Sequence, residues 1–346
     1  MGLKILHSAD WHLDSPFTGF SAEQRLLLRQ KQRQIPNLVE NVLRRENCDL
    51  VLLAGDIFDG TPQRETVSQL QRVFRQWGVP VFIAPGNHDF CGPGSIWQEE
   101  AWPENVHVFT GGWESVAIPE LDCRIWGAGY QSMDCPGLLE GFVARGEETY
   151  QIGILHADPL GSGSAYCPVT DGQVRQSGLD YLALGHIHKA DAFRSGQTLC
   201  AWPGCPMGRG WDETGEKGLY IVNLEETATV RQVLLNTVRF YNEQAEVTAL
   251  SEVLPPVKSE NFYRVTLTGF GPVDWNGLGQ AYGYLPNLQW IDRTEPVTDL
   301  WAEVGEDTLR GVYFRQLQGL SREEPLAVLA AQISRKILAG SEVILP

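Results

Sequence analysis

Two histidines separated by one residue follow a short apolar run near the middle of the chain. Residues 181–185 read YLALG, and His186 and His188 come directly after the leucine–glycine end of that run. An apolar run of this length bounded by glycine is typical of a buried strand, so both imidazoles are expected where the strand ends. Alone, the pair is equally compatible with an ordinary polar strand end, because histidines are common at half-buried positions.

The same arrangement recurs at four other places in the chain. His12, Asp56, His88 and His156 each follow an apolar run, at residues 3–6, 50–53, 81–84 and 152–155 respectively. The carboxyl ends of strands in an open α/β sheet face a common crevice, where ligands bind. We therefore expect a set of nitrogen and oxygen ligands to converge there: Asp10, His12, Asp56, Asn87, His156, His186 and His188.

This ligand set predicts a centre with two divalent ions. Seven ligands are too many for one ordinary ion, and they suit two ions about 3.5–4 Å apart that share one carboxylate. Imidazole, carboxylate and amide oxygen without cysteine favour Mn, with Fe or Zn as alternatives, over a thiolate site. Water between two such ions loses a proton near neutral pH, and both ions withdraw charge from a phosphoryl oxygen. The expected chemistry is phosphoester hydrolysis by activated water.

The sequence lacks the motifs of two other chemistries, catalysis by a serine nucleophile and ATP binding by a P-loop. No G-x-S-x-G segment places a nucleophilic serine, and no G-x-x-x-x-G-K-[ST] loop is present to bind ATP phosphates.

The motifs DWH, GDIFD, GNHD, LHAD and GHIH, in this order, resemble the signature of the calcineurin-like metallophosphoesterases. The segments LKILHSADWHLDSPF, WPGCPMGRGW and KGLYIVNLE are similar to the Mre11/SbcD nuclease branch. The resemblance covers roughly residues 1–235. It implies an α/β fold, a four-layer αββα sandwich, and a nuclease subunit that cuts DNA phosphodiesters beside an SMC-like ATPase partner of the Rad50 kind.

The resemblance also assigns roles to the candidate residues. It implies two ions that share Asp56, one held also by Asp10, His12 and His188 and the other also by Asn87, His156 and His186. For His88 it implies a proton donor or a stabiliser of the transition state, with Asp89 as a partner that fixes its ring.

Asp59 departs from the family pattern. Nucleases of this branch commonly carry a histidine where GDIFD places Asp59, and an ionised carboxylate repels a phosphate. Asp59 either caps the following turn or orients His88, or it limits the substrate to small phosphodiesters and flexible single strands rather than duplex ends.

The net charge of the chain argues against tight DNA binding by the protein alone. The formal net charge is −16, which repels a phosphate backbone, so we expect weak binding to single strands or ends by the protein alone. The basic residues Arg25, Arg29, Lys31 and Arg33 form either a solvated helix face or a DNA contact. A cyclic- or small-nucleotide phosphodiesterase with no DNA role is the alternative function, and homodimerisation stays open.

The chain is expected to form two domains. A metallophosphoesterase domain at 1–240 precedes a linker at 241–260, which contains SEVLPPVKSE, and a smaller α+β domain at 261–346. The family resemblance implies that this last domain is a capping domain beside the active-site cleft, and the alternative is an appended packing domain. We predict helices at 21–47, disturbed at Pro36, at 63–77 and at 323–339, and a strand at 262–268. Runs at 105–109, 123–127, 198–202, 218–224 and 229–235 are expected to close a second sheet.

Seven cysteines without a C-x-x-C pair indicate free thiols in a reducing compartment. No apolar stretch approaches the length of a membrane span, and no leader is recognised, so no membrane partner and a cytoplasmic location are expected.

Overall fold

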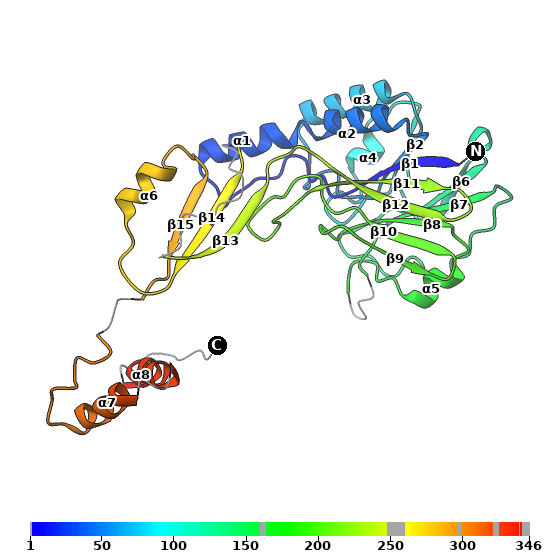
Figure 1. Cartoon of the computed structure of the whole chain (residues 1–346). Coiled ribbons are helices and arrows are strands. Elements are labelled where there is room, and N and C mark those ends of the chain that lie inside the picture. The colour runs from blue at the N-terminus through cyan, green and yellow to red at the C-terminus, as the bar shows by residue number, and fades with distance from the viewer. Residues whose placement is uncertain are drawn as a thin grey trace. The chain divides into compact units, whose positions relative to one another are not determined.

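The computed structural model describes residues 2–159, 164–247, 260–295, 299–320, 325–338 and 340. The chain divides into two compact units (Figure 1). The first comprises Met1–Glu243, Pro255–Val265 and Tyr284–Gln289, and the second comprises Gln244–Leu254, Thr266–Gly283 and Trp290–Pro346.

The first unit contains two six-stranded sheets. One sheet has the order β12-β11-β1-β2-β3-β4, in which β1 to β4 run parallel. Its strands are β1 (Leu3–Ser8), β2 (Leu50–Leu53), β3 (Val81–Ile83), β4 (Val106–Val108), β11 (Gly218–Leu224) and β12 (Ala228–Leu234). The other sheet has the order β5-β6-β7-β8-β10-β9, in which β6, β7, β8 and β10 run parallel. Its strands are β5 (Glu114–Ile118), β6 (Cys123–Gly127), β7 (Tyr150–His156), β8 (Tyr181–Gly185), β9 (Asp191–Ser195) and β10 (Thr198–Trp202).

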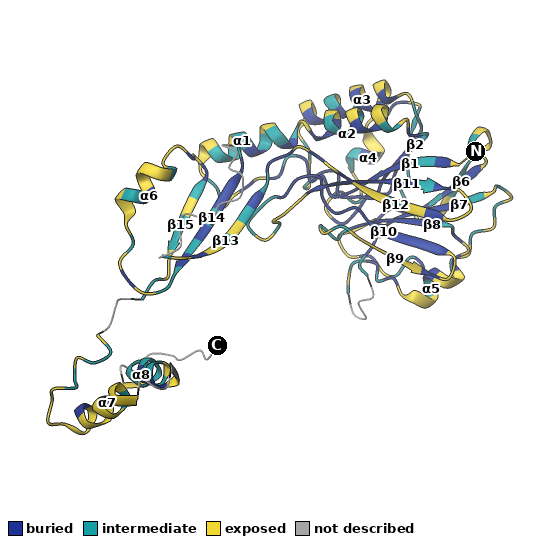
Figure 2. Ribbon diagram, viewed as in Figure 1, coloured by how far each residue is buried: buried dark blue, intermediate teal, exposed yellow. Residues whose placement is uncertain are grey.

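The alternation of side chains along the strands builds the layers. On β2, Leu50 and Leu52 enter a core shared with residues of the other sheet, whereas Val51 and Leu53 pack among side chains of the helices. Strands buried on both faces read as continuous apolar runs, and β2 and β8 are buried at every position (Figure 2). The four-layer αββα sandwich implied by the sequence is the observed architecture.

Two of the three long helices, α2 (Ile35–Glu46) and α3 (Arg64–Trp77), form the outer layer of the first sheet, and α1 (Ala22–Gln32) precedes them in the chain (Figure 1). α1 begins at a capping box in which Ser21 accepts from the backbone of Gln24, and α2 has Pro36 in its first turn. The helix predicted at 21–47 is thus two helices, because proline is accommodated at a helix start and not in its interior. α3 matches the helix predicted at 63–77. The shorter helices are α4 (Ile96–Glu99), α5 (Asp171–Gln176) and the 3-10 turn η1 (Pro119–Leu121).

One expectation about the sheets is wrong. The runs predicted to close a second sheet all form strands, but β4, β11 and β12 lie in the first sheet and only β6 and β10 lie in the second. The periodicity of a run indicates that it is a strand, but it does not indicate which other strand it pairs with. That pairing is long-range, as between β1 and β11.

A three-stranded sheet has the order β13-β14-β15, formed by β13 (Phe240–Glu246), β14 (Phe262–Thr268) and β15 (Leu288–Asp292). Strand β14 has the predicted bounds, and β13 crosses the domain boundary predicted at 240. Most of the predicted linker, at 248–259, lies outside the described residues. The second unit contains α6 (Trp275–Tyr282), α7 (Leu309–Leu320) and α8 (Pro325–Leu338), the last close to the predicted terminal helix. Across the described residues, no helix combines the length and the apolar character that a membrane crossing requires.

Candidate metal centre

The predicted ligands lie at the carboxyl ends of parallel strands of both sheets. Asp10 and His12 follow β1, Asp56 follows β2, and Asn87 follows β3, all in the first sheet; His156 ends β7, and His186 and His188 follow β8 in the second. The backbone N–H of His186 donates to both carboxylate oxygens of Asp10, at 3.1 and 3.2 Å, so the two sheets are joined at this point. Every ligand predicted from the sequence is therefore found in one region.

Asp56 lies between the histidines of the two sheets. Its Oδ2 is 3.6 Å from Nε2 of His12 and 3.4 Å from Nε2 of His156. Four groups offer ligand atoms within 4.8 Å of one another: Asp10, His12 and His188; Asp10, Asp56 and His156; His12, Asp56 and His88; and His188, Cys205 and Glu213. The central position of Asp56 is the one expected for a carboxylate shared between two ions.

Asn87 and His186 complete the side formed by His156. Nε2 of His156 lies 3.0 Å from Oδ1 of Asn87, and the rings of His156 and His186 have centroids 5.2 Å apart. The ring of His186 is close to that of His156, but neither of its nitrogens belongs to a group in which all ligand atoms lie within 4.8 Å of one another. Burial lowers the pKa of His186 to about 4, which keeps its imidazole neutral as a metal ligand requires.

The backbone at the site adopts conformations that side chains rarely take. The φ angles of Asp10, His12, Asp56 and His186 are 55°, 46°, 51° and 94°. Each such residue costs on the order of 1–3 kcal/mol, which the surrounding fold must supply, and strain of this kind clusters at functional sites. At Gly86 a Cβ would stand 2.3 Å from Oδ1 of Asp56, so only glycine lets the loop after β3 approach that carboxylate.

The side chains fit a pair of divalent cations. Asp10 and Asp56 are buried, at 1% and 2% exposure, yet within the described part of the chain only imidazoles form ion pairs with them. The Nε2 atoms of His12 and His188 are directed at each other across 3.1 Å. Two ring nitrogens in contact and two buried carboxylates are an arrangement that a bound cation stabilises.

In two of the histidines, His156 and His188, the second ring nitrogen is anchored in a way that directs Nε2 at the centre. Nδ1 of His156 lies 2.9 Å from the carbonyl of Ala54, and Nδ1 of His188 lies 2.7 Å from Oε1 of Glu213. Metal-ligating histidines generally donate their second N–H to a carbonyl or carboxylate in this manner, which fixes the ring and the tautomer. Glu213 was not predicted from the sequence.

His88 is held by a residue other than the expected one. Its Nδ1 lies 2.8 Å from Oδ1 of Asp59, whereas the expected partner, Asp89, does not contact the ring. The hydrogen bond to Asp59 raises the pKa of His88. Of the alternatives for Asp59, the structure has the one in which this carboxylate orients His88. The same carboxylate accepts from Oγ of Ser15 at 2.7 Å.

Asp89 instead fixes two loops of the centre to each other. Its buried carboxylate accepts from the backbone N–H groups of Asp56, Ile57 and Phe58 after β2, and from that of Gly86 after β3. The role expected for Asp89 as a partner of His88 is therefore wrong. The physical reason is that the side chain of Asp89 turns away from its sequence neighbour His88. It turns toward the loop after β2, whose backbone N–H groups need an acceptor.

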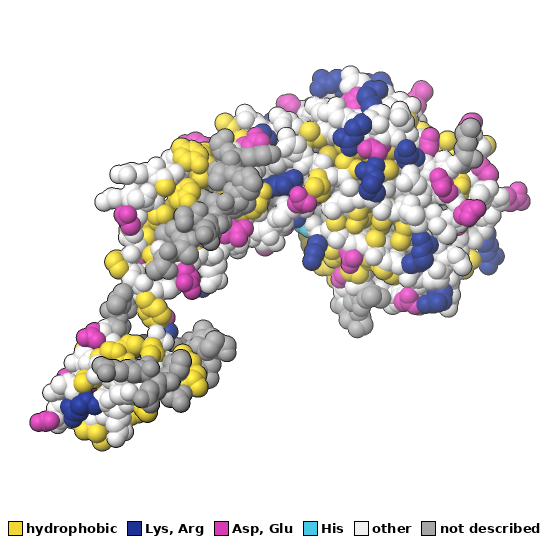
Figure 3. Space-filling model, viewed as in Figure 1, with side chains coloured by type: hydrophobic (Ala, Val, Ile, Leu, Met, Phe, Trp, Pro, Cys, Tyr) yellow, Lys and Arg dark blue, Asp and Glu magenta, His cyan; other side chains and the backbone are white. Residues whose placement is uncertain are grey.

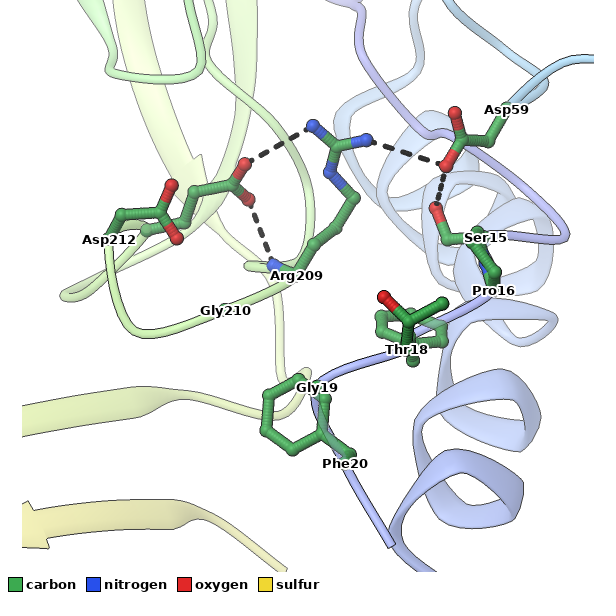
Figure 4. Close-up of a pocket in the computed structure, with 11 residues that line it drawn as sticks. Ser15, Pro16, Thr18, Gly19, Phe20, Asp59, Arg209, Gly210 and Asp212 are labelled. Carbon is green, nitrogen blue, oxygen red and sulfur yellow. Dashed lines mark hydrogen bonds and ion pairs between the residues drawn. The ribbon is translucent and has the colours of Figure 1, made fainter. Parts of the chain in front are cut away.

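Arg209 connects the two carboxylates that anchor histidines. Its guanidinium lies 3.6 Å from Asp59 and 3.4 Å from Glu213, and its backbone N–H donates to Glu213 at 2.8 Å (Figure 4). Burial opposes ionisation of Glu213, but the hydrogen bond and charge of His188, with the charge of Arg209, outweigh it and lower the pKa to about 2.

Arg209 and Glu213 lie in the segment GRGWDETGEKG between β10 and β11. The signal that points to them is an arginine and a glutamate four residues apart in a glycine-rich loop after a strand.

Comparison with known proteins identifies the family. The model of the calcineurin-like phosphoesterases matches residues 3–190, which contain every predicted ligand. The chain belongs to this family. The Bacillus subtilis protein named uncharacterized metallophosphoesterase YhaO is 35% identical over 246 residues, covering 64% of this chain and 57% of YhaO. The chain thus spans less than two thirds of that relative.

Two further similarities are more distant. The SbcD component of the nuclease SbcCD from Bacillus subtilis is 24% identical over 300 residues, covering 72% of this chain and 74% of that protein. The crystal structure of the Thermus thermophilus protein TT1561 aligns with 67% of this phosphoesterase chain and 99% of its own, at 12% identity and a TM-score of 0.43.

Proposed function

We propose that the chain is a metal-dependent phosphodiesterase that holds two divalent ions, with Mn²⁺ as the preferred ion, and hydrolyses its substrate with activated water. The observation that carries this proposal is the convergence of imidazole, carboxylate and amide ligands around Asp56. Ions bound there supply an acidified water and withdraw charge from a phosphoryl oxygen.

The chain's own residues complete the chemistry. The side chain of His88 is 40% exposed, so it can meet an incoming phosphate, while Asp59 fixes its Nδ1. The raised pKa of His88 favours the imidazolium, which donates a hydrogen bond to a phosphoryl oxygen or a proton to the leaving oxygen. Glu213 holds His188, and Asn87 contributes a neutral oxygen next to His156.

We propose DNA as the substrate, cut by this chain as the nuclease subunit of a complex with an SMC-like ATPase. The similarity to the SbcD component of the nuclease SbcCD supports this substrate. The net charge of −16 supports a partner that supplies much of the grip on DNA. In the view of Figure 3, Lys and Arg side chains are interspersed with Asp and Glu.

A phosphodiesterase for small nucleotides is the second candidate. The acidic composition favours it, because a small diester needs only the local field of the metal centre and no extended basic surface.

One set of assays separates the two. Protein stripped with chelator and reloaded with Mn²⁺ is given bis-p-nitrophenyl phosphate, a single-stranded oligonucleotide and a blunt duplex. A nuclease cuts the oligonucleotide, whereas a small-nucleotide enzyme hydrolyses the small diester and leaves DNA intact.

Removal of a ligand tests the metal centre itself. We expect Asp56→Ala and His186→Ala to lose bound metal, measured by elemental analysis, and roughly two orders of magnitude or more in turnover. His107→Ala is the control for His186→Ala, because His107 pairs with Glu114 at a half-exposed position outside the centre. An Asp56→Ala protein that stays fully loaded and active would refute the proposal.

A further inference from the structure

A pocket opens beside the metal centre in the first unit. Its volume is about 260 Å³, and its lining includes Pro16, Gly19, Phe20, Asp59, Arg209 and Asp212. Asp59, which holds His88, lines this pocket, and so does Arg209, which pairs with Asp59 and with Glu213 (Figure 4). Glu213 in turn holds His188. A molecule whose phosphate reaches His88 would therefore extend its remaining atoms into this space.

The pocket continues into a second hollow. Gly19, Phe20, Gly210 and Asp212 line both, and the second hollow, of about 630 Å³, adds Trp211, Asn242 and Arg264. Arg264 lies over the ring of Trp211, 4.3 Å from its centroid. Trp211 is itself fixed by ring contacts with Phe20, Phe240 and Phe262, at centroid distances of 6.1, 5.4 and 6.3 Å. The far end of the hollow thus carries a flat cationic surface on a rigid aromatic base.

The chemistry of these walls fits a nucleoside. Phe20 and Pro16 offer apolar surface to a base or sugar. The carboxylate of Asp212 has no hydrogen-bond partner among the described residues, so it can accept from a base amine or a sugar hydroxyl. Bases stack on aromatic rings and on guanidinium planes, and a guanidinium also pairs with phosphate oxygens.

We propose that this pocket binds the nucleoside attached to the scissile phosphate, and that Arg264 on Trp211 receives the next nucleotide of the strand. The inference rests on the proposed phosphodiesterase function and adds to it the substrate class, a single-stranded polynucleotide. A mononucleotide diester fills the first pocket only, whereas a strand fills both hollows.

A steric block tests the first pocket. Gly19 is exposed, and a Cβ built there meets no atom within 4 Å, so Gly19→Leu fills pocket space without disturbing the metal ligands. The substrates are the 5′ and 3′ p-nitrophenyl phosphate esters of thymidine, each compared with bis-p-nitrophenyl phosphate under the same metal. We expect the kcat/KM ratio of the preferred thymidine ester to bis-p-nitrophenyl phosphate to fall about tenfold.

The matched control is Gly112→Leu. A Cβ at Gly112 also meets no atom within 4 Å, and this residue does not line either hollow. Gly112→Leu leaves the ratio unchanged if the effect is specific. Should Gly19→Leu fail to fold, as judged by its melting temperature, Thr18→Leu places the same block one residue away.

The second hollow is tested by binding in chelator, where no cleavage occurs. We expect Arg264→Ala to weaken binding of a fluorescein-labelled ten-residue thymidine strand about tenfold, while Arg175→Ala, a surface arginine paired with Asp171, does not.

The outcomes separate the two proposals. One outcome is that a folded, metal-loaded Gly19→Leu protein hydrolyses bis-p-nitrophenyl phosphate and keeps the wild-type ratio of kcat/KM between the thymidine ester and that diester. This result overturns the nucleoside pocket and leaves the proposed function standing. An unaltered affinity of Arg264→Ala overturns the second hollow. Failure of the wild-type protein to hydrolyse any of the three diesters with Mn²⁺ overturns the proposed function and the inference with it.

Discussion

At the scale of single residues, His88 differs from the other histidines of the centre. Its side chain is 40% exposed, against 21% for His188 and 0% for His12, and its Nδ1 is taken by Asp59. A ring that is anchored on one side and open on the other is placed to meet substrate rather than to hold an ion. Among the candidate ligands, by contrast, His12 and His156 are fully buried, and His186 and His188 are partly buried.

This difference gives a prediction for His88. We expect His88→Asn to retain both ions by elemental analysis while turnover falls by roughly two to four orders of magnitude, because a proton donor is lost and no ligand is. Asp59→Asn should lose less, since the ring stays present but is less firmly oriented. Metal loss in parallel with turnover would make His88 a ligand.

His7 gives a prediction about acid stability. It is fully buried, its Nδ1 lies 2.7 Å from the hydroxyl of Tyr181, and burial lowers its pKa to about 3. Below pH 6.5 the unfolded chain takes up a proton that the folded protein does not, so the free energy of unfolding falls by up to about 1.4 kcal/mol per pH unit from this group.

The stability contributed by neutral His7 is therefore fully present above pH 6.5 and is lost as the pH falls. We expect His7→Gln to show a shallower decline between pH 6.5 and 5 than the wild-type protein, measured by urea unfolding. Parallel curves for the two proteins would contradict the prediction.

At the scale of elements, the loops after β2 and β3 are held together by one carboxylate. Asp89 accepts four backbone N–H groups from these loops. We expect Asp89→Ala to lower the free energy of unfolding by about 3–5 kcal/mol, because several buried donors lose their acceptor. The exposed Asp134 provides the control, and Asp134→Ala should change stability by less than about 0.5 kcal/mol.

The loop between β10 and β11 supports the centre through Glu213. Because Glu213 fixes His188 at 2.7 Å, we expect Glu213→Gln to weaken Mn²⁺ affinity roughly 10–100-fold, measured by calorimetric titration. Glu216→Gln is the matched control, since Glu216 is 60% exposed and pairs with Arg239 instead. Equal affinities in the two variants would remove Glu213 from the support of the metal centre.

At the scale of the whole molecule, net charge governs how the chain meets nucleic acid. With 43 acidic and 27 basic residues, long-range repulsion of a phosphate backbone is expected. We predict weak binding of duplex DNA by the isolated protein that weakens steeply as salt rises from about 50 to about 200 mM, measured by fluorescence anisotropy. Tight binding at physiological salt would show that a basic surface, such as Arg25 to Arg33, grips DNA without a partner.

The sequence by itself determined most of the elements and the positions of the candidate ligands at the strand ends. Short apolar runs that end in glycine or a polar side chain specify strands and their ends locally. The placement of the candidate ligands at strand ends was therefore predictable for Asp10, His12, Asp56, Asn87, His156, His186 and His188. Ser21 likewise marks the start of α1 through a capping box that involves only neighbouring residues. Such features depend on contacts within a few residues.

The tertiary structure alone decided which sheet each strand joined and which residues support the ligands. β4, β11 and β12 pair within the first sheet, which places the ends of β1, β2 and β3 against those of β7 and β8. Asp59 rather than Asp89 holds His88, and Glu213 holds His188 from 25 residues away. The physical reason is that hydrogen bonds between distant segments depend on how packed layers meet, and residue type and spacing do not encode that geometry.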